Sequence, residues 1–227
     1  MTLPANAVVR QAYLYYMTIG GPDDRLFFQG SGGCPTEQAC RRTGVLVGAS
    51  DDPGTFINQG ELSRVYRVNL PTSAIANGAF AYQIAGLGDR GAGVDGQGAS
   101  LVVVYSQPIT QSRTVVIREG SVTATNNETI SQSFTGLTVP SSPTQVRLHV
   151  GVGDGQSGQQ EDSMLFAGTA VTDPNDFFGA DGPKWDAPTL AVPTGSLPAG
   201  TNSRSTSIHV LDDNLAWGYA VLTYRYA

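Results

Sequence analysis

Carboxylates in two glycine-rich loops are the residues of this chain whose type and spacing could bind a metal ion. Asp89 and Asp95 flank one loop, and Asp154 and Asp162 line the other. Calcium takes six to eight oxygen ligands from carboxylates, carbonyls and water, so acidic loops of this kind are able to hold it. Regularly spaced aspartates of a complete calcium motif are absent from the sequence. Two interpretations stay open: solvated loop acids that cap turns, or a calcium site built from these four aspartates.

The same loops carry the glycine spacing of a dinucleotide-binding fingerprint, at residues 91–96 and 153–158. That fingerprint works where a strand leads into a helix whose N-terminus holds the pyrophosphate. Each of these loops is instead followed by another strand-like segment. We therefore predict hairpin loops here and no bound nucleotide.

The sequence contains little that indicates a catalytic site. No Gly-x-Ser-x-Gly elbow is present, and the only histidines, His149 and His209, lie in strand-like runs. His149 alternates in phase with Arg147 and Gly151, which predicts a side chain on the surface of a sheet. Paired carboxylates could cleave glycosides, but no aromatic-rich cleft flanks a particular pair. We expect a protein that is not an enzyme.

Two cysteines, Cys34 and Cys40, lie close together in a segment that we read as a loop. Their spacing closes a small ring if the chain turns back, and Pro35 favours such a turn. A disulfide is the preferred interpretation, with free thiols as the alternative. The disulfide would place the protein in an oxidising compartment.

Aromatic side chains offer a second kind of binding surface. Trp185 lies in a loop with Pro183 and Lys184 on one side and Asp186 on the other. Exposed aromatic rings stack on sugars or on a partner protein. We predict Trp185 as an exposed ligand platform, whereas Tyr13, Tyr15, Tyr16 and Trp217 are predicted as core residues.

Composition points to a turn-rich β protein. Of 227 residues, 40% are hydrophobic and only 14% are charged, with 28 glycines and 13 prolines. The formal net charge is −6, and the basic residues form no cluster in the sequence, so nucleic acid is not an expected partner. No apolar run is long enough to span a membrane as a helix. The first residues lack the features of a signal peptide, and we favour a trimmed or mature chain over a cytoplasmic protein.

The chain repeats three blocks in the same order, which predicts an internal duplication. Residues 23–30 match 161–168, residues 70–78 match 192–200, and residues 98–105 match 218–225. The blocks share strand and turn patterns and no catalytic group. Short alternating segments without helical periodicity predict an all-β fold of two related jelly-roll or β-sandwich units. The sequence does not distinguish two separate sandwiches from one larger fused sandwich.

The repeat divides the chain into a first unit at 1–106, connecting strands at 107–143 and a second unit at 144–227. The segment 8–19 is apolar on both faces, so it should be covered on both sides or face a partner. Residues 100–105 look like the most clearly buried strand of the chain. The middle segment could pack against either unit.

Residues 9–16, 24–30, 98–105 and 113–120 resemble a family of uncharacterised β-rich domains. That family occurs in predicted secreted and surface proteins of bacteria and archaea. The resemblance spans most of the chain and implies a β-rich extracellular module. The family has no catalytic residues to transfer to this sequence.

These observations predict a secreted or cell-surface module that serves adhesion, surface display or assembly of a larger structure. Its partners would be a surface protein, a polysaccharide or copies of itself. One alternative is a carbohydrate-binding or calcium-dependent lectin-like module. Another is a subunit of a filament or capsid-like assembly, because exposed sheet edges can join neighbouring molecules.

Overall fold

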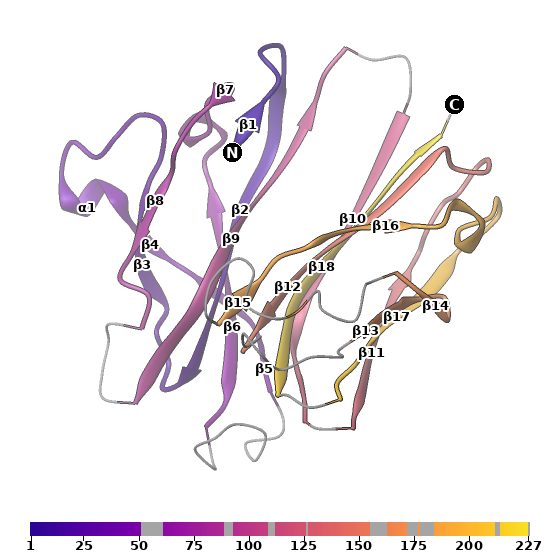
Figure 1. The fold of residues 1–227 in the computed structure, drawn as a ribbon. Helices are drawn as coiled ribbons and strands as arrows, with labels where there is room; N and C mark the ends of the chain where they lie inside the picture. Colours follow the sequence, from indigo (N-terminus) through magenta and orange to yellow (C-terminus); the bar gives the residue numbers. More distant parts are fainter. Residues whose placement is uncertain are drawn as a thin grey trace.

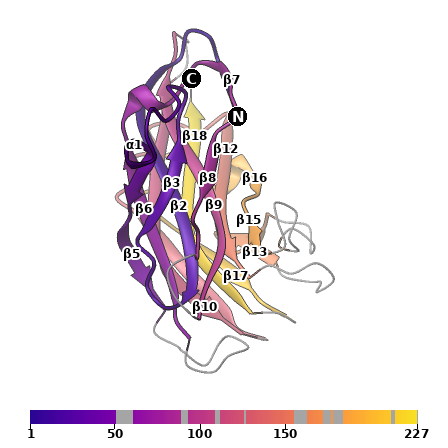
Figure 2. The same ribbon diagram turned by 90° about the vertical axis from the view of Figure 1, so that its left-hand side faces the viewer.

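The computed structural model confirms the all-β prediction. It describes residues 1–50, 61–88, 93–108, 112–125, 127–154, 163–171, 177, 184–211 and 214–226. Antiparallel sheets make up nearly all of its regular structure. Figure 1 shows the larger sheets stacked as successive layers, and Figure 2 shows the same stack from its side. Among the described residues, no helix is long and apolar enough to cross a membrane.

The first half of the chain forms two of these layers and a small added ribbon. The inner sheet has the order β5-β6-β2-β9, and the outer sheet has the order β4-β3-β8. The inner strands are β5 Val45–Ala49, β6 Ser63–Leu70, β2 Val8–Gly20 and β9 Val94–Ser106. The outer strands are β3 Arg25–Gln29, β4 Arg41–Thr43 and β8 Gln83–Ala85. The ribbon pairs β1 Thr2–Leu3 with β7 Gly78–Ala79.

The second half supplies the other two layers. Its inner sheet has the order β10-β18-β12-β15, with β16 also paired to β12, and its outer sheet has the order β11-β17-β13-β14. The inner strands are β10 Ser112–Ala124, β12 Gln145–Gly153, β15 Trp185–Asp186, β16 Thr189–Val192 and β18 Leu215–Tyr226. The outer strands are β11 Thr129–Thr135, β13 Ser163–Phe166, β14 Thr169–Ala170 and β17 Ser203–His209.

The middle segment of the sequence joins the second half. β10 pairs with β18 along most of its length, and β11 pairs with β17. In the part of the chain that the structure describes, neither strand pairs with a strand of the first half. The sequence did not show which unit the connecting segment packs against. In the structure, its strands β10 and β11 belong to the two sheets of the second half.

Three apolar clusters hold the layers together. One fills the space between the sheets of the first half, and a second fills the space between the sheets of the second half. The third lies between the two inner sheets and includes Tyr15, Met17, Trp185 and Tyr219. Strand β2 explains this arrangement, because its alternate residues face different clusters. The prediction that β2 is apolar on both faces because both are covered is confirmed.

Equivalent pairings in the two halves support the predicted duplication. Leu14 of β2 lies opposite Leu101 and Val68, while Leu148 of β12 lies opposite Leu222 and Leu190. One-turn 3₁₀ helices follow the matching strands β6 and β16, at Thr72–Ala74 and Thr194–Ser196. The duplication and the jelly-roll topology stay predictions that these correspondences support.

The third repeated block needs a shift of one residue. The sequence aligns Leu101 with Val221, yet Leu101 faces the core of its own half and Val221 faces the cluster between the inner sheets. Pairing places Leu101 at the position of Leu222 instead. Because side chains alternate between faces, a slip of one residue exchanges inside and outside. The sequence match was too weak to show which residues of the two strands face the same side of the sheet.

Candidate functional site

Among the strands that the structure describes, β9 has a free edge. β9 is 13 residues long, and among the described strands it pairs only with β2. Its residues from Gly98 to Val104 are only partly buried, and Tyr105 is 38% exposed. The prediction that residues 100–105 form the most clearly buried strand is wrong, because the strand lies at the end of its sheet.

The matching strand of the second half has no such edge. β18 lies between β10 and β12 and pairs with both. Its residues from Leu215 to Leu222 are all buried. The first half has no described strand in the place that β10 takes beside β18. The matching strands β9 and β18 thus differ in that β18 has a described strand on each side and β9 has one on one side only.

The edge of β9 also lacks the usual protection of an edge strand. Exposed edges are commonly shielded by charged side chains, prolines or short strand length. Residues 96–112 contain no Asp, Glu, Lys or Arg, and the first proline, Pro108, comes after the strand ends. Asp95, near the start of β9, is the one charged residue of the strand, and the long uncharged edge from Gly96 to Ser106 is able to pair with another strand.

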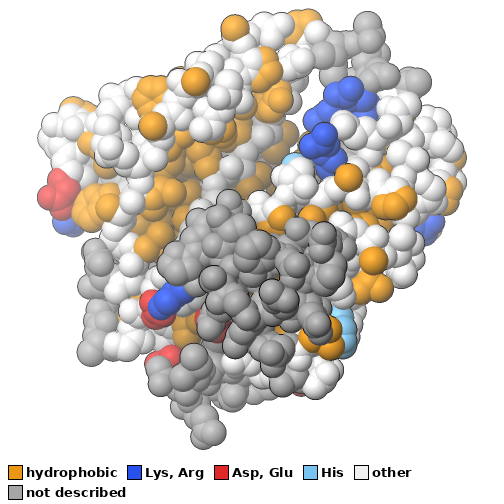
Figure 3. Space-filling model, viewed as in Figure 1, with side chains coloured by type: hydrophobic (Ala, Val, Ile, Leu, Met, Phe, Trp, Pro, Cys, Tyr) orange, Lys and Arg blue, Asp and Glu red, His pale blue; other side chains and the backbone are white. Residues whose placement is uncertain are grey.

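A groove of about 750 Å³ lies between β9 and the inner sheet of the second half. Figure 3 shows the molecule hollowed here, with hydrophobic side chains on one wall and basic side chains on the other. Residues from β9 form the first wall, from Ser100 to Ser106. The second wall comes from β10, β12, β16 and β18, with the lining residues Arg113, Val115, His149, Thr189, Tyr219, Val221, Thr223 and Arg225. The volume is in the range of ligand-binding pockets.

Arginines from three strands converge at this groove. Arg113 of β10 lies directly opposite Arg225 of β18, and Arg147 of β12 is the diagonal neighbour of Arg225. Arg113 and Arg225 line the groove, and Arg147 follows the same alternation as the lining residue His149. The basic residues are scattered along the sequence, and these three become neighbours only in the folded sheet. Strand register brings together residues that are far apart along the chain.

His149 lies in the groove wall as a half-buried residue. Its Nδ1 atom is 2.8 Å from the Thr189 hydroxyl oxygen. Desolvation lowers the pKa of His149, and the positive charges of Arg147 and Arg113 lower it further. The predicted phase of His149 on its sheet is correct, although that surface faces a groove between sheets.

The aspartates predicted as metal ligands are only partly within the described residues. Asp89 and Asp162 lie outside them. Asp95 accepts hydrogen bonds from the Gln97 amide at 3.1 Å and from the Lys184 ammonium group, and the Asp154 amide donates to the Lys184 carbonyl. Among the residues that the structure describes, no group of three or more His, Cys, Asp or Glu side chains is placed to hold a metal ion. A calcium site stays a prediction.

Trp185 does not form the exposed platform that the sequence suggested. Its side chain is only 4% exposed and packs over Gly98 in the cluster between the inner sheets. Its indole N–H donates to the Ser100 hydroxyl at 2.9 Å. The prediction is wrong because β15 pairs with the end of β12 and turns the ring inward. Tyr15, Tyr16 and Trp217 are buried, as predicted.

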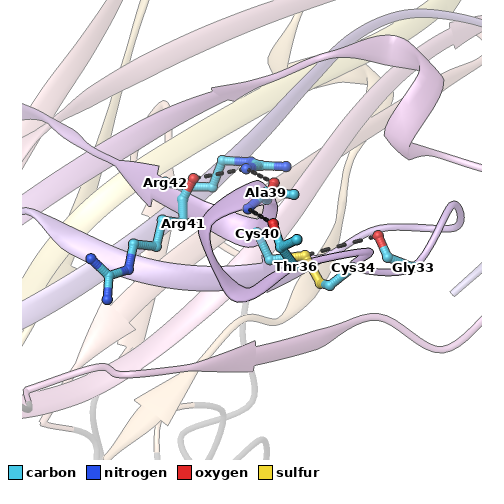
Figure 4. Close-up of a disulfide and its surroundings, with 7 residues drawn as sticks. All are labelled: Gly33, Cys34, Thr36, Ala39, Cys40, Arg41 and Arg42. Carbon is cyan, nitrogen blue, oxygen red and sulfur yellow. Dashed lines mark hydrogen bonds between the residues drawn. A yellow bond between two sulfur atoms is a disulfide. The ribbon is translucent and has the colours of Figure 1, made fainter.

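The predicted disulfide between Cys34 and Cys40 is present, as Figure 4 shows. The ring that it closes contains one helical turn, Glu37–Cys40, where the sequence suggested only a loop. Thr36 begins this turn, and its hydroxyl accepts a hydrogen bond from the Ala39 amide at 3.2 Å. The disulfide lies on the outer sheet of the first half, away from the groove lining.

No family model and no curated protein matches this chain. Solved structures with a detectable likeness include the glycoside hydrolase BuGH86 bound to neoagarooctaose, at a TM-score of 0.40 and 11% identity, covering 98% of this chain and 34% of that one. Another is BpGH86A, a β-porphyranase from Bacteroides plebeius, at a TM-score of 0.38 and 13% identity, covering 99% and 37%. The major capsid protein P2 of bacteriophage PM2 is similar at a TM-score of 0.29 and 10% identity, covering 100% and 94%.

This chain thus spans about a third of the hydrolase chains that it resembles. Likenesses at this level do not identify a function.

Proposed function

We propose that this protein is a non-enzymatic, extracellular β-sandwich module that assembles with copies of itself by adding a strand at the free edge of β9. The observation that carries the proposal is the contrast between β9 and β18. The edge of β18 is covered by β10, and the matching edge of β9 has no described partner. Pairing with a strand from another molecule would satisfy the outward backbone groups of β9.

The disulfide supports the extracellular part of the proposal. Disulfides persist in oxidising environments and are rare in the cytosol. The environments of the two histidines support a non-enzymatic role. Nδ1 of His149 and Nδ1 of His209 each lie within hydrogen-bond distance of a threonine hydroxyl, on Thr189 and Thr129. Neither contact is an arrangement of nucleophile, base and orienting acid.

Analytical ultracentrifugation over a range of protein concentrations tests the assembly. The wild-type chain should show a mass that rises with concentration. Tyr105→Lys places a charge at the exposed end of β9 and should keep the protein monomeric, because charged side chains oppose pairing at an edge. The control is Val45→Lys on β5, which ends the opposite side of the same sheet and is 58% exposed in the wild type.

The control variant should assemble as the wild type does. A wild-type chain that stays monomeric up to several hundred micromolar, or a Tyr105→Lys variant that assembles normally, would overturn this function.

A further inference from the structure

The arginines at the groove form a basic site within an acidic protein. The whole chain has a net charge of −6, yet none of the described residues that line the groove is acidic. Arg113 and Arg225 are cross-strand neighbours on β10 and β18, and Arg147 lies diagonally across from Arg225 on β12. Figure 3 shows basic side chains gathered on one side of the hollow, beside a histidine.

Like charges placed directly opposite each other destabilise a sheet. The pKa of Arg113 is lowered by desolvation, and the positive charges of Arg225 and Arg147 lower it further. The Arg113 guanidinium group donates a hydrogen bond to the neutral Gln145 amide oxygen at 3.3 Å. The Nε atom of Arg225 is buried and has no hydrogen-bond partner among the described residues. An anion between these guanidinium groups would relieve the repulsion and accept their hydrogen bonds.

The remaining lining residues indicate what would carry the anionic group. The hydroxyl-bearing residues Ser100, Ser106, Thr189 and Thr223 line the groove, together with apolar residues of β9. Such hydroxyls donate and accept hydrogen bonds, as the hydroxyl groups of a sugar do. The volume of about 750 Å³ is large enough for a short oligosaccharide and larger than a single inorganic ion requires.

We propose that the groove between β9 and the inner sheet of the second half binds an acidic saccharide, with its carboxylate or sulfate group held by Arg113, Arg147 and Arg225. A guanidinium group matches the geometry of a carboxylate or sulfate with two parallel hydrogen bonds. The hydroxyl-bearing residues hold the sugar rings. This site does not depend on strand addition at β9, since Arg113 and Arg225 line the other wall and Arg147 lies on β12 of the same sheet.

Isothermal titration calorimetry with a uronic-acid oligosaccharide and a sulfated oligosaccharide tests the proposal and distinguishes the two anionic groups. At least one should bind the wild-type chain. The double variant Arg113→Gln/Arg225→Gln should lose affinity by a factor of about 10 to 100, because two charged hydrogen-bonding groups are removed. Arg41→Gln is the matched control, since Arg41 lies on β4, pairs with Glu37 and does not line the groove.

Two further measurements separate a built site from general charge attraction. A neutral oligosaccharide of the same length and a polyglutamate peptide should both bind at least 10-fold more weakly than the acidic saccharide. Without ligand, the double variant should melt at a temperature no lower than the wild type, which shows that the fold is intact. Binding of neither acidic saccharide, equal binding by the double variant, or equal binding of polyglutamate would each overturn the proposal.

Discussion

The Tyr15 hydroxyl of β2 donates a hydrogen bond of 2.7 Å to a carboxylate oxygen of Glu119 on β10. Arg67 of β6 forms an ion pair with the same carboxylate. This contact joins the inner sheets of the two halves through polar groups, beside the apolar cluster that contains Tyr15 and Tyr219. Burial raises the pKa of Tyr15, and the hydrogen bond to Glu119 raises it further, so the hydroxyl stays protonated and donates.

Replacing Tyr15 by Phe should lower the free energy of unfolding by about 1 to 2 kcal/mol, because the carboxylate loses a donor while the ring packing stays. Urea denaturation measures the change. Tyr13→Phe is the control, since Tyr13 lies on the same strand and its ring is near the Arg67 guanidinium group. Its hydroxyl makes no hydrogen bond to the described residues. Equal stability of the two variants would contradict a structural role for the hydroxyl.

Gly98 is required where Trp185 crosses β9. A Cβ atom at this position would lie 2.4 Å from the Trp185 Cβ atom and 2.5 Å from its Cγ atom. Gly98→Ala should therefore destabilise the protein by about 1 to 3 kcal/mol through overpacking. Tryptophan fluorescence during urea denaturation detects both the loss of stability and a displaced indole ring.

Gly120→Ala is the matched control for that substitution, because a Cβ at Gly120 would meet no atom within 4 Å. Its effect should be limited to the small change that Gly to Ala causes in a strand. If Gly98→Ala is as stable as Gly120→Ala, the indole does not pack against β9 as described.

His149 should make stability depend on pH. Its folded pKa is lowered by desolvation and by Arg147 and Arg113, while the unfolded value is about 6.5. The unfolded chain therefore binds a proton more readily, and the free energy of unfolding decreases as the pH falls below about 6.5. Above that pH His149 is neutral in both states, so it causes no loss of stability there.

Denaturation at pH 7.5 and pH 5.0 checks this dependence in the wild type and in His149→Gln. The variant should lose less stability between the two pH values than the wild type does. His209→Gln provides the comparison, because His209 lies on β17 of the outer sheet. A His149→Gln variant with the same pH dependence as the wild type would show that the arginines do not act on this histidine.

Much of the architecture is encoded in local patterns. Alternation on both faces of residues 8–19 requires two covered faces, since apolar side chains on either side of a strand must leave water. Pro71 and Pro193 each precede a short helical turn in the structure, and the matching sequence blocks predicted this correspondence. Close spacing of Cys34 and Cys40 favoured the disulfide, because the ends of a short loop are close in space.

The candidate sites could not be predicted from the sequence. Arg113, Arg147 and Arg225 are far apart along the chain and meet only because β10, β18 and β12 pair in one register. Trp185 was predicted at the surface because it lies in a loop-like segment, yet β15 turns its ring between the inner sheets.

The sequence alone determined that this chain forms strands, where most of them turn and which of them need cover on two faces, since these properties depend on residues close together in the chain. Only the tertiary structure decided that β18 has β10 as a neighbour, while β9 has no described strand in the matching place. Strands pair through backbone N–H and C=O groups, which nearly all residues share, and the paired strands can be far apart in the chain. The side-chain pattern of β9 and β18 therefore could not reveal which strand had a neighbour.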